Sequence, residues 1–363
     1  MTNGNIIFTR KDTAELVDRP MPAPKAGEVR VRLVRSCISS GTERANLTGV
    51  PDNAVGVFTD PDRATVTFPR QGGYSSSGIV DAVGEGVAGL KEGDRVAMSW
   101  TVHAQFVCVP AERAYPIPGN VSFADAAFAH ISTFPMAAIR KCRLEIGEPS
   151  LVMGQGVLGQ IAVMLLRAGG AAPIVAADPD AGKRETALRL GADYAFDPLA
   201  PDFAGRVKEV CRGGRKALEG NVDDDGAKVV VEVTGNGGAL DTALDAAAPF
   251  ARLALLGCTR DSNFTVNYYR KVHARGVTMV GAHTSARPSH ESAAGWWTTR
   301  DDACAFLRLL SLGRISLKGF VAETHKPQEC AEVYARLAKG GAFPVVQFDW
   351  TSQTSQNHGT SRT

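Results

Sequence analysis

The chain has 363 residues, 44% of them hydrophobic and 21% charged, which is ordinary for a soluble globular protein. Its 40 basic and 38 acidic side chains leave a net charge of +2 with no basic stripe, which argues against nucleic acid and anionic membranes as partners. No apolar run approaches the roughly 18 residues that cross a bilayer, and the length suits two domains.

Seven cysteines are scattered along the chain without a C-x-x-C pair, so neither a disulfide framework nor a zinc knuckle is indicated. The start, MTNGNIIFTRKD, has only a short apolar stretch at 6–8 and no hydrophobic region of a signal peptide. These features predict a cytoplasmic protein. The polar segment 351–363 is expected to be a disordered tail.

The segment 5–118 has the texture of short strands and turns. Residues 29–34 alternate apolar and basic side chains, the period-two pattern of a half-buried strand. Segments 78–84 and 95–98 indicate further strands, separated by glycine-containing turns. We therefore predict a small barrel-like β region.

From about residue 125 to 282 strands alternate with helices, which predicts a parallel sheet. The expected strands are 150–154, 173–177, 193–196, 228–233, 251–257 and 277–282. The expected helices are 157–168, 180–190, 202–212, 237–247 and 267–274. Six strands with five crossovers form the two halves of a doubly wound dinucleotide fold. Helices at about 300–312 and 327–339 and a strand at 344–348 follow, and this last part is expected to return to the β region.

The glycine motif G-Q-G-V-L-G at 154–159 lies between a predicted strand and a predicted helix. In that context G-x-G-x-x-G is typical of a dinucleotide-binding turn. Gly154 permits the tight turn, Gly156 lets the backbone approach a pyrophosphate, and Gly159 allows close helix packing. The following helix would point its positive N-terminus at the phosphates. A purely structural glycine-rich turn is the alternative.

Asp178 ends the next strand, where its carboxylate can accept ribose hydroxyls and would repel a 2′-phosphate, so NAD is favoured over NADP. Lys183 and Arg184 could reach a phosphate, which weakens that preference, and Asp178 could instead cap the next helix. Loops after two later strands could line the nicotinamide or be ordinary turns. The predicted cofactor site comprises Gly154, Gly156, Val157, Leu158, Gly159, Asp178, Lys183, Thr234, Gly235, Leu256, Gly257 and Cys258.

Several strings resemble the medium-chain dehydrogenase/reductase superfamily, the relatives of zinc alcohol dehydrogenase. Beside the glycine motif they are GTE at 41–43, GYSSSG at 73–78, LKEGDRV at 90–96, HAQFVCVP at 103–110 and LGAD at 190–193. The resemblance extends to Trp350. It implies an α/β fold with a GroES-like β-barrel catalytic domain at 1–125, completed by 283–350, and a Rossmann domain that binds NAD at 126–282.

The zinc-binding strings of that superfamily are altered here. Its C-G-T-D string starts with Ser40, its G-H-E string reads Gly73-Tyr74-Ser75, and Ala129 stands at the third ligand position. Catalytic zinc takes thiolate, imidazole or carboxylate ligands, which these positions do not supply. The resemblance therefore implies a metal-free member. Within the superfamily it is similar to a branch related to two-domain sugar-modifying oxidoreductases and to the bacteriochlorophyllide dehydrogenase group.

Without zinc, a side chain must take or give the hydroxyl proton. The resemblance implies that Thr42 relays this proton, as the matching hydroxyl does in zinc relatives. Tyr74 is a candidate phenol donor or base, His130 a candidate acid or base, and Glu43 could orient or charge one of them. Alternatively, Tyr74 is a packed surface ring and His130 a buried histidine bonded to a carbonyl. His103 is expected to be structural.

Two further groups have open interpretations. Trp296 and Trp297 could form a lid over the substrate or could pack their loop. His283, Arg287 and His290 follow the sixth strand and could bind a polar substrate or lie in a solvated loop.

The leading hypothesis is an NAD-dependent oxidoreductase that interconverts a secondary alcohol of sugar, cyclitol or polyol type and its ketone by hydride transfer. A zinc-free enone or quinone reductase keeps the fold, but such relatives usually favour NADPH. A non-catalytic cofactor-binding relative is the third possibility. A small-molecule substrate is expected, and the apolar sixth strand at 277–280 favours a homodimer or homotetramer.

Overall fold

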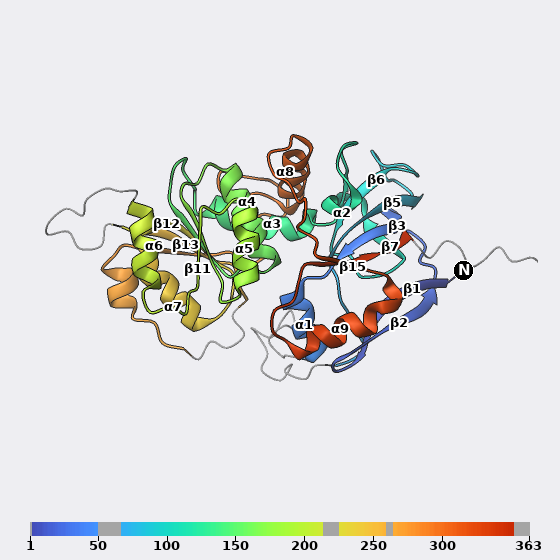
Figure 1. Ribbon diagram of the computed structural model, residues 1–363. Coiled ribbons are helices and arrows are strands. Elements are labelled where there is room, and N and C mark those ends of the chain that lie inside the picture. The colour runs from blue at the N-terminus through green and yellow to red at the C-terminus, as the bar shows by residue number, and fades with distance from the viewer. Residues whose placement is uncertain (1, 50–66, 213–224, 259–263, 352–363) are drawn as a thin grey trace, which may run out of the picture. The chain divides into compact units, whose positions relative to one another are not determined.

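The computed structural model describes residues 2–49, 67–212, 225–258 and 264–351, and the chain divides into two compact units (Figure 1). Unit 1 comprises Met1–Ile131, Ala303–Ser311 and Leu317–Thr363, and unit 2 comprises Ser132–Asp302 and Leu312–Ser316. The predicted tail lies outside the described residues except for Thr351. Among the helices of the described part, none is both long and apolar enough to span a membrane.

Unit 2 is built on a parallel six-stranded sheet in the order β11-β10-β9-β12-β13-β14. Its strands are β9 (Ser150–Met153), β10 (Ile174–Ala177), β11 (Tyr194–Phe196), β12 (Ala227–Glu232), β13 (Ala247–Leu255) and β14 (Thr278–Gly281). Its crossover helices are α4 (Val157–Ala168), α5 (Ala181–Arg189), α6 (Phe203–Arg212) and α7 (Gly237–Ala246). This order is that of the doubly wound dinucleotide fold, so the predicted fold class is confirmed.

The central strands of this sheet are buried on both faces because the crossover helices pack on them. β9 and β10 are buried at every position, and α4 packs on both of them, while α6 and α7 pack on β12. Continuous apolar runs therefore replace the alternation of an exposed sheet. The predicted helix at 267–274 is present only as a π-helical turn at Tyr269–His273.

Unit 1 contains a seven-stranded sheet and a three-stranded sheet in the order β2-β1-β4. In the larger sheet the order is β15-β16-β3-β5-β6-β8, and β7 also pairs with β3. The strands are β1 (Thr2–Arg10), β2 (Thr13–Pro20), β3 (Glu28–Cys37), β4 (Arg70–Gln71), β5 (Ser75–Val83), β6 (Arg95–Ser99), β7 (Phe106–Pro110), β8 (Ala114–Pro116), β15 (Glu323–His325) and β16 (Val346–Asp349). The helices that lie wholly within it are α1 (Ser40–Thr48), α2 (Phe123–Ala126) and α9 (Cys330–Lys339).

Two helices cross the division between the units. They are α3 (Ala129–Lys141), which the sequence pattern did not indicate, and α8 (Thr299–Ser311). The division therefore falls after residues 131 and 302, whereas the sequence placed it after 125 and 282. Contacts to α3 explain the later position. Arg287 donates to the Thr133 carbonyl at 2.7 Å, and Arg140 donates to Asp302 at 2.8 Å, so residues 283–302 pack within unit 2.

Candidate functional site

The three glycines of the turn in unit 2 are needed for two different reasons. Gly154 has a φ of 95°, and a Cβ there would lie 2.8 Å from Thr234 Cγ2. A Cβ at Gly159 would lie 1.8 Å from the Gly154 oxygen. At Gly156, however, a Cβ would meet no heavy atom within 4 Å. Internal packing therefore requires glycine at 154 and 159, while the open space at 156 suits the approach of a ligand.

Helix α4 starts at this turn with Gly156 as its N-cap, and no side chain caps it. The first amides of an α-helix have no partner inside the helix, and together with the helix dipole they attract anions. Val157 and Leu158 form this first turn. The arrangement can hold a phosphate group against the helix end.

The carboxylate of Asp178 is fixed beside the glycine turn. One oxygen accepts the Gln155 amide at 2.8 Å and the other accepts the Asp180 amide at 2.9 Å, and the residue is only 6% exposed. Asp178 does not cap α5, since Asp180 is the N-cap and accepts the Lys183 amide at 2.9 Å. Each carboxylate oxygen can accept more than one hydrogen bond, so Asp178 keeps acceptor capacity for a ligand hydroxyl.

The two basic residues that follow differ in their surroundings. Arg184 donates to the carbonyls of Asp178 and Pro179 at 2.7 and 2.9 Å, which engages its guanidinium at the strand end. Lys183 lies in the first turn of α5, half-buried. Arg184 therefore stabilises the backbone that carries Asp178.

The two predicted strand-end loops are interlocked. A Cβ at Gly235 would lie 2.4 Å from the Cys258 oxygen, and a Cβ at Gly257 would lie 2.2 Å from the Gly235 nitrogen. The amides of Leu256 and Gly257 both donate to the Glu232 carbonyl at 2.9 Å. The structure thus brings together the two loops that the sequence assigned to the cofactor.

Glu232, which the sequence analysis missed, also holds the first of these loops through its side chain. Its carboxylate accepts the Thr234 amide at 2.7 Å, the Thr234 hydroxyl, and the Gly235 amide at 3.2 Å. Burial raises the pKa of this carboxyl, although the hydrogen bonds from Thr234 and Gly235 oppose the rise. A lone acid that ends an apolar strand, as in Val229-Val230-Val231-Glu232, was the available signal.

In unit 1, Tyr74 and His130 come together. The ring centroids lie 5.5 Å apart with edge-on geometry, and the Tyr74 hydroxyl donates to Ser39 Oγ. Tyr74 is 8% exposed and His130 is fully buried, so Tyr74 is not a surface ring. Ser75 holds the segment that carries His130, because its hydroxyl donates to the Ala127 carbonyl at 2.6 Å and accepts the Ile131 amide at 3.4 Å.

Trp100 adds an aromatic ring that the sequence analysis did not single out. Its centroid lies 4.6 Å from that of His130 and 6.2 Å from that of Tyr74. The side chain is 47% exposed, and the backbone has a φ of 60°. A bulky residue is strained in this left-handed region, and such strain clusters at functional sites.

Glu43 is the centre of a buried hydrogen-bond network in unit 1. Its carboxylate accepts the Ser39 amide at 2.8 Å and the Tyr334 hydroxyl, and it lies 3.0 Å from His103 Nε2. The other nitrogen of His103 lies 2.7 Å from Ser36 Oγ. Burial and the Glu43 charge raise the pKa of Tyr334 well above its usual range. Glu43 therefore connects to Tyr74 through Ser39, which bonds to both.

Thr42 precedes Glu43 on α1 and is half-buried. Its position on the same helix turn as Glu43 is fixed by α1, whose N-cap is Ser39. The four candidate catalytic residues thus all lie in unit 1, where Tyr74 and His130 are in contact and Ser39 links Tyr74 to Glu43.

The residues after the sixth strand have structural contacts within unit 2. Arg287 pairs with the buried Asp302 at 3.4 Å, and Arg140 stacks on Trp297 with its guanidinium carbon 3.5 Å from the ring centroid. Trp296 lies under Lys141, whose nitrogen is 4.8 Å from its ring centroid. His283 and His290 are exposed. The two tryptophans pack against basic side chains of α3.

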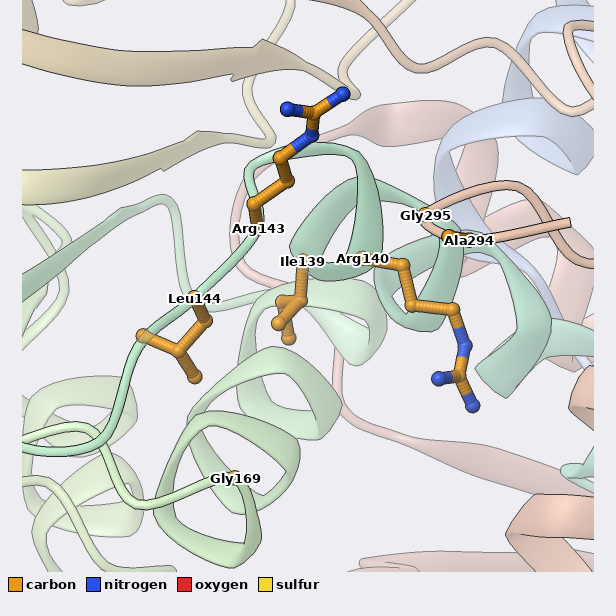
Figure 2. A pocket seen from close by; sticks show the side chains of 7 residues that line it. All are labelled: Ile139, Arg140, Arg143, Leu144, Gly169, Ala294 and Gly295. Carbon is orange, nitrogen blue, oxygen red and sulfur yellow. The ribbon is translucent and has the colours of Figure 1, made fainter.

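A hollow of about 620 Å³ lies elsewhere in unit 2 (Figure 2). It is lined by Ile139, Arg140, Arg143, Leu144, Gly169, Ala294 and Gly295. Figure 2 shows Arg140 and Arg143 pointing in different directions, so their charges do not converge on one point. None of the predicted site residues lines it. Within residues 2–49, 67–212, 225–258 and 264–351, no group of three or more His, Cys, Asp or Glu side chains is arranged to hold a metal ion.

The chain is similar to several characterised proteins. It is 24% identical to L-threonine 3-dehydrogenase of Pyrococcus horikoshii over 92% of this chain and 94% of the relative. It is 26% identical to D-guloside 3-dehydrogenase of Shigella flexneri over 78% of this chain and 82% of the relative.

Solved structures share the fold. One is a Sinorhizobium meliloti protein described as a zinc-binding dehydrogenase and bound to NADP, with a TM-score of 0.76 and 18% identity over 96% of this chain and 99% of that one. Another is a short chain alcohol dehydrogenase from Escherichia coli complexed with NADH, with a TM-score of 0.76 and 19% identity over the same shares.

Two family models match in the expected order. The alcohol dehydrogenase GroES-like domain matches residues 25–135, and the zinc-binding dehydrogenase domain matches residues 157–299. The first match covers the strands of unit 1 around Tyr74, and the second starts at the first residue of α4. With these two domains, the relatives and the shared fold, the chain belongs to the medium-chain dehydrogenase/reductase superfamily.

Proposed function

We propose that this protein is an NAD-dependent oxidoreductase that interconverts a secondary alcohol, of sugar, cyclitol or polyol type, and the corresponding ketone. The observation that carries the proposal is the Asp178 carboxylate held at 2.8 Å from the Gln155 amide, beside the open space at Gly156. A carboxylate at this place suits a ribose diol, and the uncapped α4 N-terminus suits a pyrophosphate. L-Threonine 3-dehydrogenase and D-guloside 3-dehydrogenase are named for oxidation of secondary alcohols, which supports the substrate class.

NAD is proposed over NADP because the Asp178 charge would repel a 2′-phosphate. Arg184, one of the two basic candidates for such a phosphate, already donates to two strand-end carbonyls. The two solved relatives hold NADP and NADH respectively, so the preference rests on residues of this chain.

Zinc does not fit the residues at the family's ligand positions. Ser40 and Ala129 offer no thiolate, imidazole or carboxylate, and the Tyr74 hydroxyl is bonded to Ser39. His130 is a single imidazole packed between two aromatic rings. We therefore propose a metal-free reaction, although the matching family domain carries zinc in its description.

A bound nicotinamide cofactor would supply the hydride chemistry at the substrate carbon. The residues of this chain must then move the hydroxyl proton. Tyr74 is the proposed acid and base, since its phenol lies in a hydrogen bond with Ser39 and can exchange that bond for one to a substrate oxygen. The Glu43 carboxylate fixes Ser39 by accepting a hydrogen bond from the Ser39 backbone amide. His130 positions the Tyr74 ring, and Thr42 is proposed to pass the proton onward.

Trp100 is proposed to contact the substrate. Its ring is half exposed and lies against the Tyr74 and His130 rings. An exposed aromatic face packs well on the carbon face of a sugar or cyclitol ring, whose C–H groups are apolar. This is a further reason to favour ring-shaped polyols.

The protein is proposed to act in the cytoplasm as a homodimer or homotetramer. β14 is one of the two edge strands of the unit 2 sheet and presents half-buried Met279 and Val280. An apolar edge strand favours pairing with a second copy.

The proposal is tested by screening alcohols, sugars and cyclitols for reduction of NAD, followed by the absorbance of NADH, with the metal content of the protein measured in parallel. We expect turnover with NAD and no stoichiometric zinc. NADPH consumption with enones or quinones, and none with alcohols, would instead identify a reductase. Stoichiometric zinc required for turnover would contradict the metal-free reaction.

A further inference from the structure

Glu232 lies at the one place in the unit 2 sheet where the strand order reverses. β12, which it ends, pairs with β9, and Glu232 is in register with Met153, directly before the glycine turn. In open parallel sheets, ligands bind beyond the carboxyl ends of the strands at this switch point. A carboxylate here is therefore next to the expected ligand position, although the sequence analysis assigned it no role.

Glu232 accepts hydrogen bonds from both loops that are predicted to line the nicotinamide, 234–235 and 256–258. Its side chain accepts the amides of Thr234 and Gly235 at 2.7 and 3.2 Å and the Thr234 hydroxyl, while its carbonyl accepts the amides of Leu256 and Gly257 at 2.9 Å. The residue is 2% exposed. A buried carboxylate that accepts several donors fixes the groups that donate to it.

The two loops pack closely against each other and against the glycine turn. Gly235 has a φ of 66°, and the space for its Cβ is filled by the Cys258 backbone at 2.4 Å. Thr234 in turn packs against Gly154, since a Cβ there would lie 2.8 Å from Thr234 Cγ2. A shift of the Thr234–Gly235 turn would therefore be transmitted to the glycine turn and to the Cys258 loop.

We propose that Glu232 is a positioning residue for the nicotinamide half of the cofactor, which it serves by holding the 234–235 and 256–258 loops in one arrangement. The proposal rests on the proposed function, because it requires a nicotinamide dinucleotide in unit 2. It gives Glu232 a role distinct from that of Asp178, which is proposed to bind the adenosine ribose. Loss of Glu232 should therefore affect cofactors that carry nicotinamide and leave the ADP-ribose part unaffected.

Glu232→Gln tests this with little change of shape. Glutamine keeps one acceptor oxygen but places an amide donor opposite another backbone donor, such as the Gly235 amide. Equilibrium binding of NADH and of ADP-ribose is measured for the wild type and the variant by titration calorimetry. We expect about a tenfold rise in the Kd for NADH, which is about 1.4 kcal/mol, and a change of less than about twofold for ADP-ribose.

Asp302→Asn is the matched control. Asp302 is also a buried acid of unit 2, and its carboxylate accepts a hydrogen bond from Arg140 and forms an ion pair with Arg287. We expect it to leave the ratio of the two Kd values unchanged. If Glu232→Gln does not fold, Thr234→Val removes the hydroxyl donor to Glu232, and it should raise the Kd for NADH selectively by a smaller factor.

Three results overturn the proposal. They are unchanged NADH binding by the folded variant, an equal loss of NADH and ADP-ribose binding, and the same selective loss in Asp302→Asn. A wild-type protein that binds neither ligand overturns the proposed function itself. Binding of both ligands by the wild type, with an equal loss in Glu232→Gln, overturns the role of Glu232 alone.

Discussion

The imidazole of His130 lies edge-on against the phenol ring of Tyr74, with centroids 5.5 Å apart, although 55 residues separate them along the chain. β5 starts directly after Tyr74, and α3 begins just before His130. Ser75 ties these elements together through Ala127 and Ile131. His130 is fully buried in this contact, while the Tyr74 hydroxyl donates a hydrogen bond to Ser39.

Tyr74→Phe removes this hydroxyl and keeps the ring contacts. We expect kcat to fall by about 100-fold or more, because a general acid and base is lost, while the melting temperature changes little. Tyr115→Phe is the control, since Tyr115 is buried in the same unit with its hydroxyl 2.8 Å from Ser99 Oγ. Unchanged turnover in Tyr74→Phe would remove Tyr74 from the mechanism.

Glu43→Gln should destabilise the fold. The carboxylate accepts Ser39 and Tyr334 and contacts His103 in the core of unit 1, and the neutral amide leaves at least one of these donors without an acceptor. We expect the free energy of unfolding in urea to fall by about 2 kcal/mol. The exposed Glu92→Gln should leave it unchanged. Equal stability of the wild type and Glu43→Gln would show that the charge of Glu43 makes no net contribution to the free energy of unfolding.

Asp178→Asn should weaken cofactor binding and its selectivity. An amide keeps one acceptor but loses the charge, so we expect the Kd for NAD to rise by about tenfold and the preference over NADP to shrink. Asp180→Asn is the control because asparagine caps a helix as well as aspartate does. Fluorescence titration with NADH and NADPH measures both values, and an unaltered preference would argue against Asp178 as the ribose acceptor.

The Glu148–Arg252 pair should make stability depend on acid pH. Burial alone would raise the pKa of Glu148, but the hydrogen bonds from Arg252 and from the Glu145 amide, with the Arg252 charge, hold this pKa below its usual value. A carboxyl with a lowered pKa stabilises the fold above its unfolded value, and this contribution is lost as the pH falls through the folded value.

The stability difference between wild type and Glu148→Gln should therefore shrink between about pH 6 and about pH 3. Urea unfolding at each pH measures it, with the exposed Glu145→Gln as the matched variant. A difference that stays constant over this range would mean that Arg252 does not favour the ionised form.

Met279→Lys should disrupt the proposed assembly. A charge on an edge strand opposes pairing with a second copy. We expect the wild type to sediment as a dimer or tetramer and the variant as a smaller species in analytical ultracentrifugation. Leu199→Lys, at an exposed apolar position away from β14, should have no effect. A monomeric wild type would disprove assembly through this edge.

Local sequence patterns predicted the six strands of the unit 2 sheet and the position of its glycine turn. Apolar runs of strand length, helical patterns between them and the motif at 154–159 are local signals, and they predicted α4 at Val157–Ala168 with the bounds that the structure has. Local signals suffice because strand and helix periods are set by nearest neighbours. They failed at α3, whose sequence carries an internal proline, Pro135.

The contacts between polar side chains from distant segments are visible only in the folded structure. Ser39 links Tyr74 to Glu43, and Tyr334 reaches Glu43 from α9 across 291 residues of sequence. Glu232 accepts hydrogen bonds from one loop with its carboxylate and from the other with its backbone carbonyl. Hydrogen bonds between distant segments leave no periodic trace in the sequence, because each partner is a single residue whose neighbours obey the local pattern. The pairing of β12 with β9 is what places Glu232 beside the glycine turn.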